Sequence, residues 1–156
     1  MVSPDPLTIR KAVDSDERHL TDLSARMANF ALPPWRTADE ITSADRRAMI
    51  DALRAAHPDS EVFIAEREEI VAGCLHVVVA SDFFGRRHAH VSVIATSLAA
   101  EGTGVGRALM DFADEWARAR QLPFITLNVF AANSRARRLY ERCAYGVELL
   151  NYAKRL

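Results

Sequence analysis

The chain has 156 residues, of which 49% are hydrophobic and 26% are charged, and its 20 basic residues nearly balance its 21 acidic ones. This length predicts a single domain over residues 1–156, large enough to bury a core of its own. The net charge of −1 argues against a general nucleic-acid binder. Because no apolar run approaches the roughly 20 residues that span a bilayer and no signal-peptide pattern opens the sequence, we expect a cytoplasmic protein with no membrane partner.

The two cysteines do not predict a metal site. Cys74 and Cys143 are the only cysteines, and neither lies in a CxxC motif or near histidines at zinc-ligand spacing. Both have apolar neighbours, which favours two reduced core residues, although the sequence leaves a disulfide open.

The first half of the chain alternates between helical and strand patterns. Apolar residues at three- to four-residue spacing predict helices, and runs of β-branched residues predict strands. The expected elements are a strand at residues 7–10, a helix from 14 to about 30, a helix at 38–57, and strands at 61–66, 70–80 and 88–96.

The second half begins with a glycine loop, residues 101–106, that opens directly into an amphipathic helix. A strand at 124–130 follows, then a helix at 134–143 that Asn133 can cap, and an extended tail, 144–156. The order is therefore β-α-α-β-β-β-α-β-α-β. It predicts an α/β fold with a mixed, mostly antiparallel sheet and one parallel β-α-β crossover near residues 88–130.

The glycine loop is the main indication of chemistry. Glycines at positions 102, 104 and 106 let an anion approach the backbone N–H groups at a helix N-terminus, which favours a phosphate or pyrophosphate site. An ordinary tight turn would need only one glycine. The loop fits neither the Rossmann fingerprint, whose third glycine would fall at Arg107, nor a P-loop, whose Gly-Lys pair would fall at Arg107-Ala108.

The sequence resembles the GCN5-related N-acetyltransferases (GNAT) at two signatures. The coenzyme A signature Q/R-x-x-G-x-G/A matches residues 101–106 at every position but the first, which is Glu101. The second signature, Asn-x-x-Ala-x-x-x-Tyr, matches Asn133 to Tyr140, although the Gly-Phe that often follows is Ala144-Tyr145 here. The resemblance covers nearly the whole chain in element order, and its specific part is residues 88–145.

The resemblance implies an enzyme that transfers the acetyl group of acetyl-CoA to a primary amine by direct attack, without a metal. It places the pantetheine arm on exposed main chain in a splayed pair of strands and the pyrophosphate on the glycine loop. The implied cofactor-binding residues are Ile94, Ala95, Thr96, Gly102, Thr103, Gly104, Val105, Gly106, Arg107, Asn133 and Tyr140. A carboxylate at Glu101 would repel phosphate, unless Arg107 offsets it or Glu101 points to solvent.

The implied catalytic residues are Tyr140 and His90. A tyrosine hydroxyl can donate a hydrogen bond or a proton to the departing thiolate, and a histidine can accept the proton that the amine loses. A core tyrosine on the inner face of a helix and a structural histidine at a strand end are the alternatives, and His76 is a weaker candidate base.

The family resemblance places the acceptor, a small-molecule or peptide amine, between the loops at residues 30–36 and 81–87. Their aromatic residues Trp35, Phe83 and Phe84 are the implied acceptor-binding residues, although core packing or a dimer contact would explain them equally well. The last helix has a basic face made of Arg135, Arg137, Arg138 and Arg142. One of them could meet the cofactor's 3′-phosphate, although a solvated face is the default interpretation. The alternatives are a non-catalytic acyl-CoA-binding or regulatory module, and an interaction protein whose tail pairs with another subunit, which leaves a homodimer open.

Overall fold

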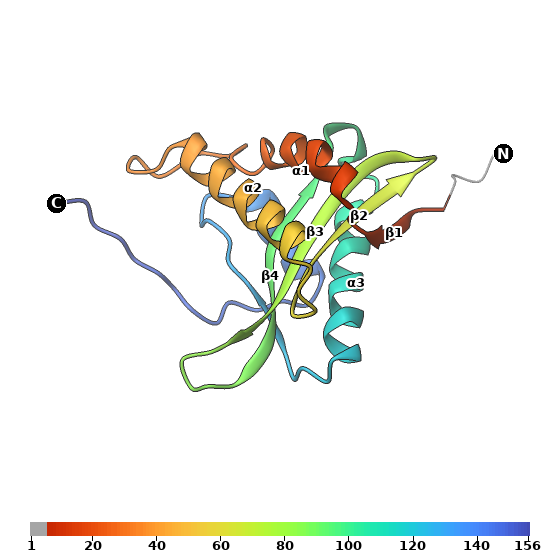
Figure 1. Ribbon diagram of the computed structural model, residues 1–156. Helices are drawn as coiled ribbons and strands as arrows, with labels where there is room; N and C mark the ends of the chain where they lie inside the picture. The colour runs from red at the N-terminus through yellow and green to blue at the C-terminus, as the bar shows by residue number, and fades with distance from the viewer. Residues whose placement is uncertain (1–5) are drawn as a thin grey trace.

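The computed structural model describes residues 6–156 and contains one five-stranded sheet. Its strands lie side by side in chain order (Figure 1): β1 (Thr8–Lys11), β2 (Ser60–Arg67), β3 (Ile70–Ser81), β4 (Arg87–Thr96) and β5 (Ile125–Leu127). The first four strands pair antiparallel, whereas β5 runs parallel to β4. This arrangement confirms the mixed sheet and the single parallel crossover predicted from the sequence.

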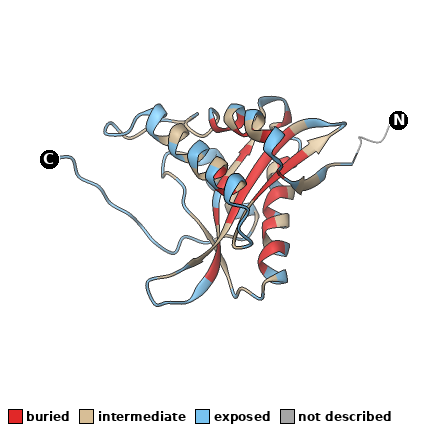
Figure 2. Cartoon of the chain, viewed as in Figure 1, coloured by how far each residue is buried: buried red, intermediate tan, exposed pale blue. Residues whose placement is uncertain are grey.

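Helices cover both faces of the sheet (Figure 1). On one face lie α1 (Glu17–Ser24), which follows the short 3-10 turn η1 (Asp14–Asp16), and α2 (Ala38–Ala55). On the other lie α3 (Val105–Ala119), preceded by η2 (Leu98–Ala100), and α4 (Ser134–Arg142). Buried residues follow the central strands and the inner side of α3, so each face of the sheet has its own apolar core (Figure 2).

Helix α1 is shorter than its apolar spacing predicts. It ends at Ser24, whose hydroxyl donates to the carbonyl of Thr21 at 2.7 Å, and residues 25–28 form turns. Such side-chain bonds compete with the backbone ladder and favour helix ends. Met27 and Phe30 therefore lie outside the helix, where both line the pocket described below.

A β-bulge in β4 and a short β5 open one end of the sheet. Val77 pairs with Val91 while His76 pairs with Val93, so Ser92 is an extra residue in β4. Consequently Val91 packs on the α3 side and Val93 on the α1–α2 side. The pairing of β4 with β5 ends at Val91 and Leu127.

The last expected strand does not form. Residues 145–156 are extended but belong to no helix or strand, and in Figure 1 they run away from the sheet. A strand requires a neighbour to accept its backbone hydrogen bonds, and the tail has none. The apolar side chains Val147, Leu149 and Tyr152 are exposed as a result.

Two further expectations concern cysteines and membranes. Cys74 and Cys143 are both free thiols, as expected, and Cys74 is buried whereas Cys143 is half-buried. Within residues 6–156, no helix is both long enough and apolar enough to cross a bilayer.

Candidate active site

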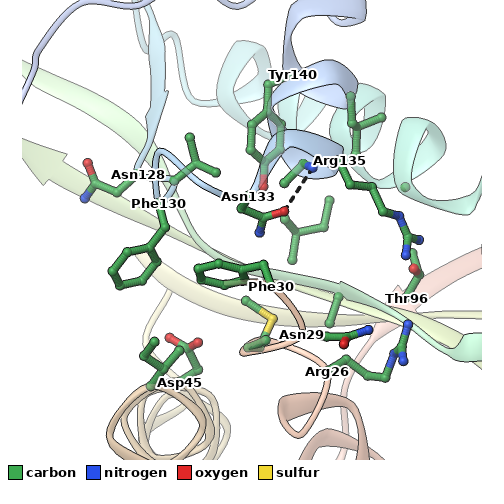
Figure 3. A pocket seen from close by; sticks show the side chains of 18 of the residues that line it. Arg26, Asn29, Phe30, Asp45, Thr96, Asn128, Phe130, Asn133, Arg135 and Tyr140 are labelled. Atoms are coloured by element: carbon green, nitrogen blue, oxygen red, sulfur yellow. Dashed lines mark hydrogen bonds between the residues drawn. The ribbon is translucent and has the colours of Figure 1, made fainter. Parts of the chain in front are cut away.

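A pocket of about 1070 Å³ opens where β4 and β5 separate. One wall is formed by Ser92, Ile94, Ala95 and Thr96 of β4, and the opposite wall is the segment from Asn128 to Phe130 that follows β5. The α1–α2 loop, the inner side of α2, the glycine loop and the first turns of α4 complete the lining (Figure 3). Ile94, Ala95 and Thr96, which follow the last β4–β5 pair at Val91 and Leu127, therefore line the cavity.

The glycine loop meets the pocket with the N-terminus of α3. Gly102 and Gly104 have φ of 72° and 88°, left-handed values that favour glycine, and both line the pocket. Gly104 is the N-cap residue of α3, and no side chain caps the helix. The first N–H groups of α3 therefore lack a side-chain partner and carry the positive end of the helix dipole, which suits a phosphate.

Glu101, at the start of this loop, forms ion pairs with two arginines. Its Oε1 pairs with Arg26 from the turn after α1 and with Arg135 from α4, and all three residues line the pocket. The hydrogen bond from Arg135, followed by the nearby charges of Arg135 and Arg26, lowers the pKa of Glu101. Two cations and one carboxylate leave a net positive charge, so Glu101 organises this side of the pocket instead of repelling an anion from it.

Tyr140 projects from α4 into the pocket (Figure 3). The helix is fixed at its start by Asn133, whose Oδ1 accepts a hydrogen bond from the N–H of Ala136 at 3.2 Å. Burial raises the pKa of Tyr140 to about 12, and its hydroxyl has no hydrogen-bond partner within residues 6–156. A neutral phenol with a free hydroxyl is available to donate a hydrogen bond into the cavity.

His90 lies in the same pocket on β4. Its Nδ1 is 2.7 Å from Oγ1 of Thr126, its partner in the parallel register with β5. Burial, and then the charge of His88, lower the pKa of His90, so its imidazole is neutral at neutral pH. His76 is buried, its pKa falls to about 4, and it does not line the pocket. Of the two histidines, only His90 lines the pocket.

Three implied cofactor residues have side chains that point elsewhere. Thr103 donates its hydroxyl to the carbonyl of Ala100, and Val105 is buried in the core. Arg107 binds Asp111 and the carbonyl of Arg142, so Arg26 and Arg135, rather than Arg107, balance Glu101. None of these three residues lines the pocket.

The three implied acceptor-binding aromatics do not line the pocket. Phe83 and Phe84 pack edge to face at the tip of the β3–β4 hairpin and are 97% and 81% exposed. Trp35 is 41% exposed in the α1–α2 loop, whereas its neighbours Phe30 and Arg36 do reach the cavity.

Two features of the pocket were missed at the sequence level. The rings of Phe30 and Phe130 pack against each other with centroids 5.2 Å apart, and the carboxylate of Asp45 faces them from α2 (Figure 3). Phe30 begins the loop 30–36 that the resemblance places at the acceptor, although its spacing also suits the preceding helix, and the pairing of Phe30 with Phe130 was not predicted. Asp45 lies one helical turn from both Ile41 and Met49, which places an acidic residue on the apolar side of the helix. This unusual position is the sequence signal that could have predicted Asp45 in a pocket.

No metal centre accompanies these residues. Among the described positions, no cluster of three or more His, Cys, Asp or Glu side chains could hold a metal ion.

The sequence model of the acetyltransferase (GNAT) family matches residues 24–145 of this chain. The chain belongs to this family. GNAT proteins use acyl-CoA to acetylate amine acceptors, and most are acetyl-CoA-dependent N-acetyltransferases. A comparison with curated protein sequences finds no match.

Solved structures share the GNAT fold with this chain. The ribosomal-protein-alanine N-acetyltransferase of Brucella melitensis biovar Abortus 2308 is 20% identical, with a TM-score of 0.71 over 97% of this chain and 100% of that one. The glucosamine-6-phosphate N-acetyltransferase of Arabidopsis thaliana is 18% identical, with a TM-score of 0.67 over 97% of this chain and 99% of that one. An aminoglycoside N-acetyltransferase in complex with CoA is 14% identical, with a TM-score of 0.72 over 100% and 99% of the two chains. These likenesses establish the fold, and the three acceptors named differ.

Proposed function

We propose that this GNAT protein transfers the acetyl group of acetyl-CoA to a primary amine of a small molecule or peptide. The observation that carries the proposal is one pocket that brings together an uncapped helix N-terminus, open strand backbone, His90 and Tyr140. The first two features suit a pyrophosphate and its extended arm, and the last two suit proton handling in acyl transfer.

The residues present fit a coenzyme A thioester. The amides of the glycine loop, with Arg26 and Arg135 beside them, would hold phosphates, and Ile94 to Thr96 would pair with the pantetheine amides. The bound cofactor supplies an electrophilic thioester carbon and a thiolate leaving group. A backbone N–H of Ile94 or Ala95 would polarise the thioester carbonyl, as oxyanion donors do.

His90 and Tyr140 divide the proton chemistry. The amine lone pair forms the new C–N bond, the C–S bond breaks, and the amine proton passes to His90 directly or through water. A phenol with a pKa of about 12 is a weaker acid than a thiol, whose ordinary pKa is ~8.5. Tyr140 therefore donates a hydrogen bond to the developing thiolate without giving up its proton. The thiolate takes up a proton from solvent, and His90 returns the amine's proton to solvent, so the step balances.

The proposal is tested by mixing the protein with acetyl-CoA and a panel of amines and measuring free thiol. We expect thiol release that depends on the amine and a product amide detected by mass spectrometry. Coenzyme A binding without amine-dependent thiol release would instead indicate the non-catalytic acyl-CoA-binding module.

The pyrophosphate site gives a direct binding prediction. Gly104→Val places a branched side chain at a left-handed backbone position beside the anion, so coenzyme A affinity should fall at least tenfold, about 1.4 kcal/mol. Calorimetry measures the affinity of the folded variant. Gly85→Val is the matched control, because Gly85 also has a left-handed φ, of 80°, but lies in the β3–β4 turn away from the pocket. Equal losses in both variants would contradict the assignment.

We also propose a cytoplasmic homodimer in which the tail of each copy lies on its partner. The support is the exposed apolar side of the tail and the unpaired outer edge of β5. Charged substitutions Val147→Lys and Leu149→Lys in the full chain should convert a dimer to a monomer in light scattering after size exclusion. Lys154→Glu, at an exposed polar position of the tail, is the control, and a wild-type monomer would refute the dimer.

A further inference from the structure

Asp45 is a pocket carboxylate without a partner. Three carboxylates of the described chain line the pocket: Glu40, Asp45 and Glu101. Glu40 accepts hydrogen bonds from Thr37 at the start of α2, and Glu101 holds two arginines. Within residues 6–156, the carboxylate of Asp45 has neither a hydrogen bond nor an ion pair. This leaves Asp45 as the free negative charge of the cavity.

The position of Asp45 is costly for a carboxylate. Burial alone raises the pKa of Asp45 to about 6, and no cation lowers it. Asp39 and Asp51, on the same helix, are exposed. A half-buried charge without a partner destabilises a fold unless something that binds there compensates it.

The surroundings of Asp45 are apolar and aromatic. Figure 3 shows its carboxylate directed toward the rings of Phe30 and Phe130, with Tyr140 on the other side of the rings. Met27 also lines the pocket. Aromatic faces attract ammonium groups as well as hydrocarbon. A ligand that reaches from Tyr140 to Asp45 would cross this apolar section and end at a negative charge.

We propose that Asp45 binds a second cationic group of the acceptor, which lies across an apolar spacer from the amine that is acetylated. The acceptor class is then a diamine, or another amine with a distant positive charge, whose spacer lies against Phe30 and Phe130. This inference rests on the proposed function for the identity of the reacting amine. The binding of the distant cation can nevertheless be measured without turnover.

The test uses two amides that differ only in the distant cation. N-acetyl-1,4-bis(aminomethyl)benzene keeps one ammonium, and N-acetyl-4-methylbenzylamine has none. Calorimetry on coenzyme A-saturated protein should show at least tenfold tighter binding of the cationic amide by the wild type. Asp45→Asn, which keeps the shape and removes the charge, should abolish that preference, whereas Asp51→Asn on the exposed side of α2 should keep it.

Each outcome decides the inference. Equal binding of the two amides by the wild type, no binding of either, or a preference that survives Asp45→Asn would overturn it. Thermal melting confirms that Asp45→Asn folds, since removing an unpaired charge should leave the melting temperature unchanged or higher. Thiol release from acetyl-CoA with 1,4-bis(aminomethyl)benzene is measured separately. An Asp45-dependent binding preference without thiol release would refute the acetyltransferase proposal alone. Thiol release without that binding preference would refute the Asp45 inference alone.

Discussion

Tyr140→Phe is expected to lower kcat by about 10²–10³, the usual scale of losing one hydrogen-bond donor to a developing negative charge, with little loss of stability. The substitution keeps the ring and its packing, and the hydroxyl has no hydrogen bond to lose within residues 6–156. KM for acetyl-CoA should change less than kcat, because the hydrogen bond strengthens as charge develops on sulfur.

The same experiment separates catalysis from packing by comparing kcat with the melting temperature. Tyr145→Phe is the matched control, since Tyr145 packs 6.2 Å from Tyr140 between ring centroids but does not line the pocket. Its hydroxyl is buried without a hydrogen-bond partner among residues 6–156, so removing it should leave kcat unchanged and the melting temperature equal or higher. A stable Tyr140→Phe protein with wild-type kcat would make Tyr140 a packing residue.

Local patterns predicted most of the framework. The helices α2, α3 and α4 and the strands β2, β3 and β4 follow from periodicity and from start and stop signals that act within a few residues. The glycine loop was predictable for the same reason, because the left-handed backbone at Gly102 and Gly104 favours glycine at those positions whatever the distant contacts are. The order of the elements then restricted the sheet to one crossover, which is where the pocket opens.

Features that depend on distant contacts could not be predicted. The partners of Glu101 come from α4 and from the turn after α1, so a residue that suggested repulsion in isolation is neutralised by tertiary structure. The separation of β4 from β5 depends on the bulge at Ser92, which no sequence pattern marked. Phe83 and Phe84 were placed at the acceptor by their loop, but the length of the β3–β4 hairpin carries them away from the pocket.

The tail shows the limit of periodicity as a predictor. The tail was expected as the last strand of the order, yet a strand also needs a partner, and residues 145–156 run away from the sheet without pairing with the outer edge of β5. Likewise, Asp45 interrupts an apolar helix side. Sequence alone does not distinguish an isolated solvated acid from one directed into a cavity, because that depends on where the α1–α2 loop places Phe30.

His90→Ala is expected to lower kcat/KM by about 10² at neutral pH, because the amine then loses its proton without a positioned base. The sign of the pH dependence follows from burial. The pKa of His90 is lowered from 6.5, so the wild type carries a neutral imidazole at pH 7 and loses the base only as the pH falls through that lowered pKa. The deficit should narrow at high pH, where free amine is abundant.

A pH–rate profile from pH 5 to 10 measures this effect. In the wild type, the acid limb assigned to His90 should lie below pH 6.5, since burial moves the pKa downward; in His90→Ala that limb should disappear and the rate should rise with the fraction of unprotonated amine. His57→Ala removes an exposed histidine at the end of α2, outside the pocket, and should retain the wild-type profile. If His90→Ala and the wild type have the same profile, His90 is not the base, and a water held by the backbone of β4 would have to take the amine proton.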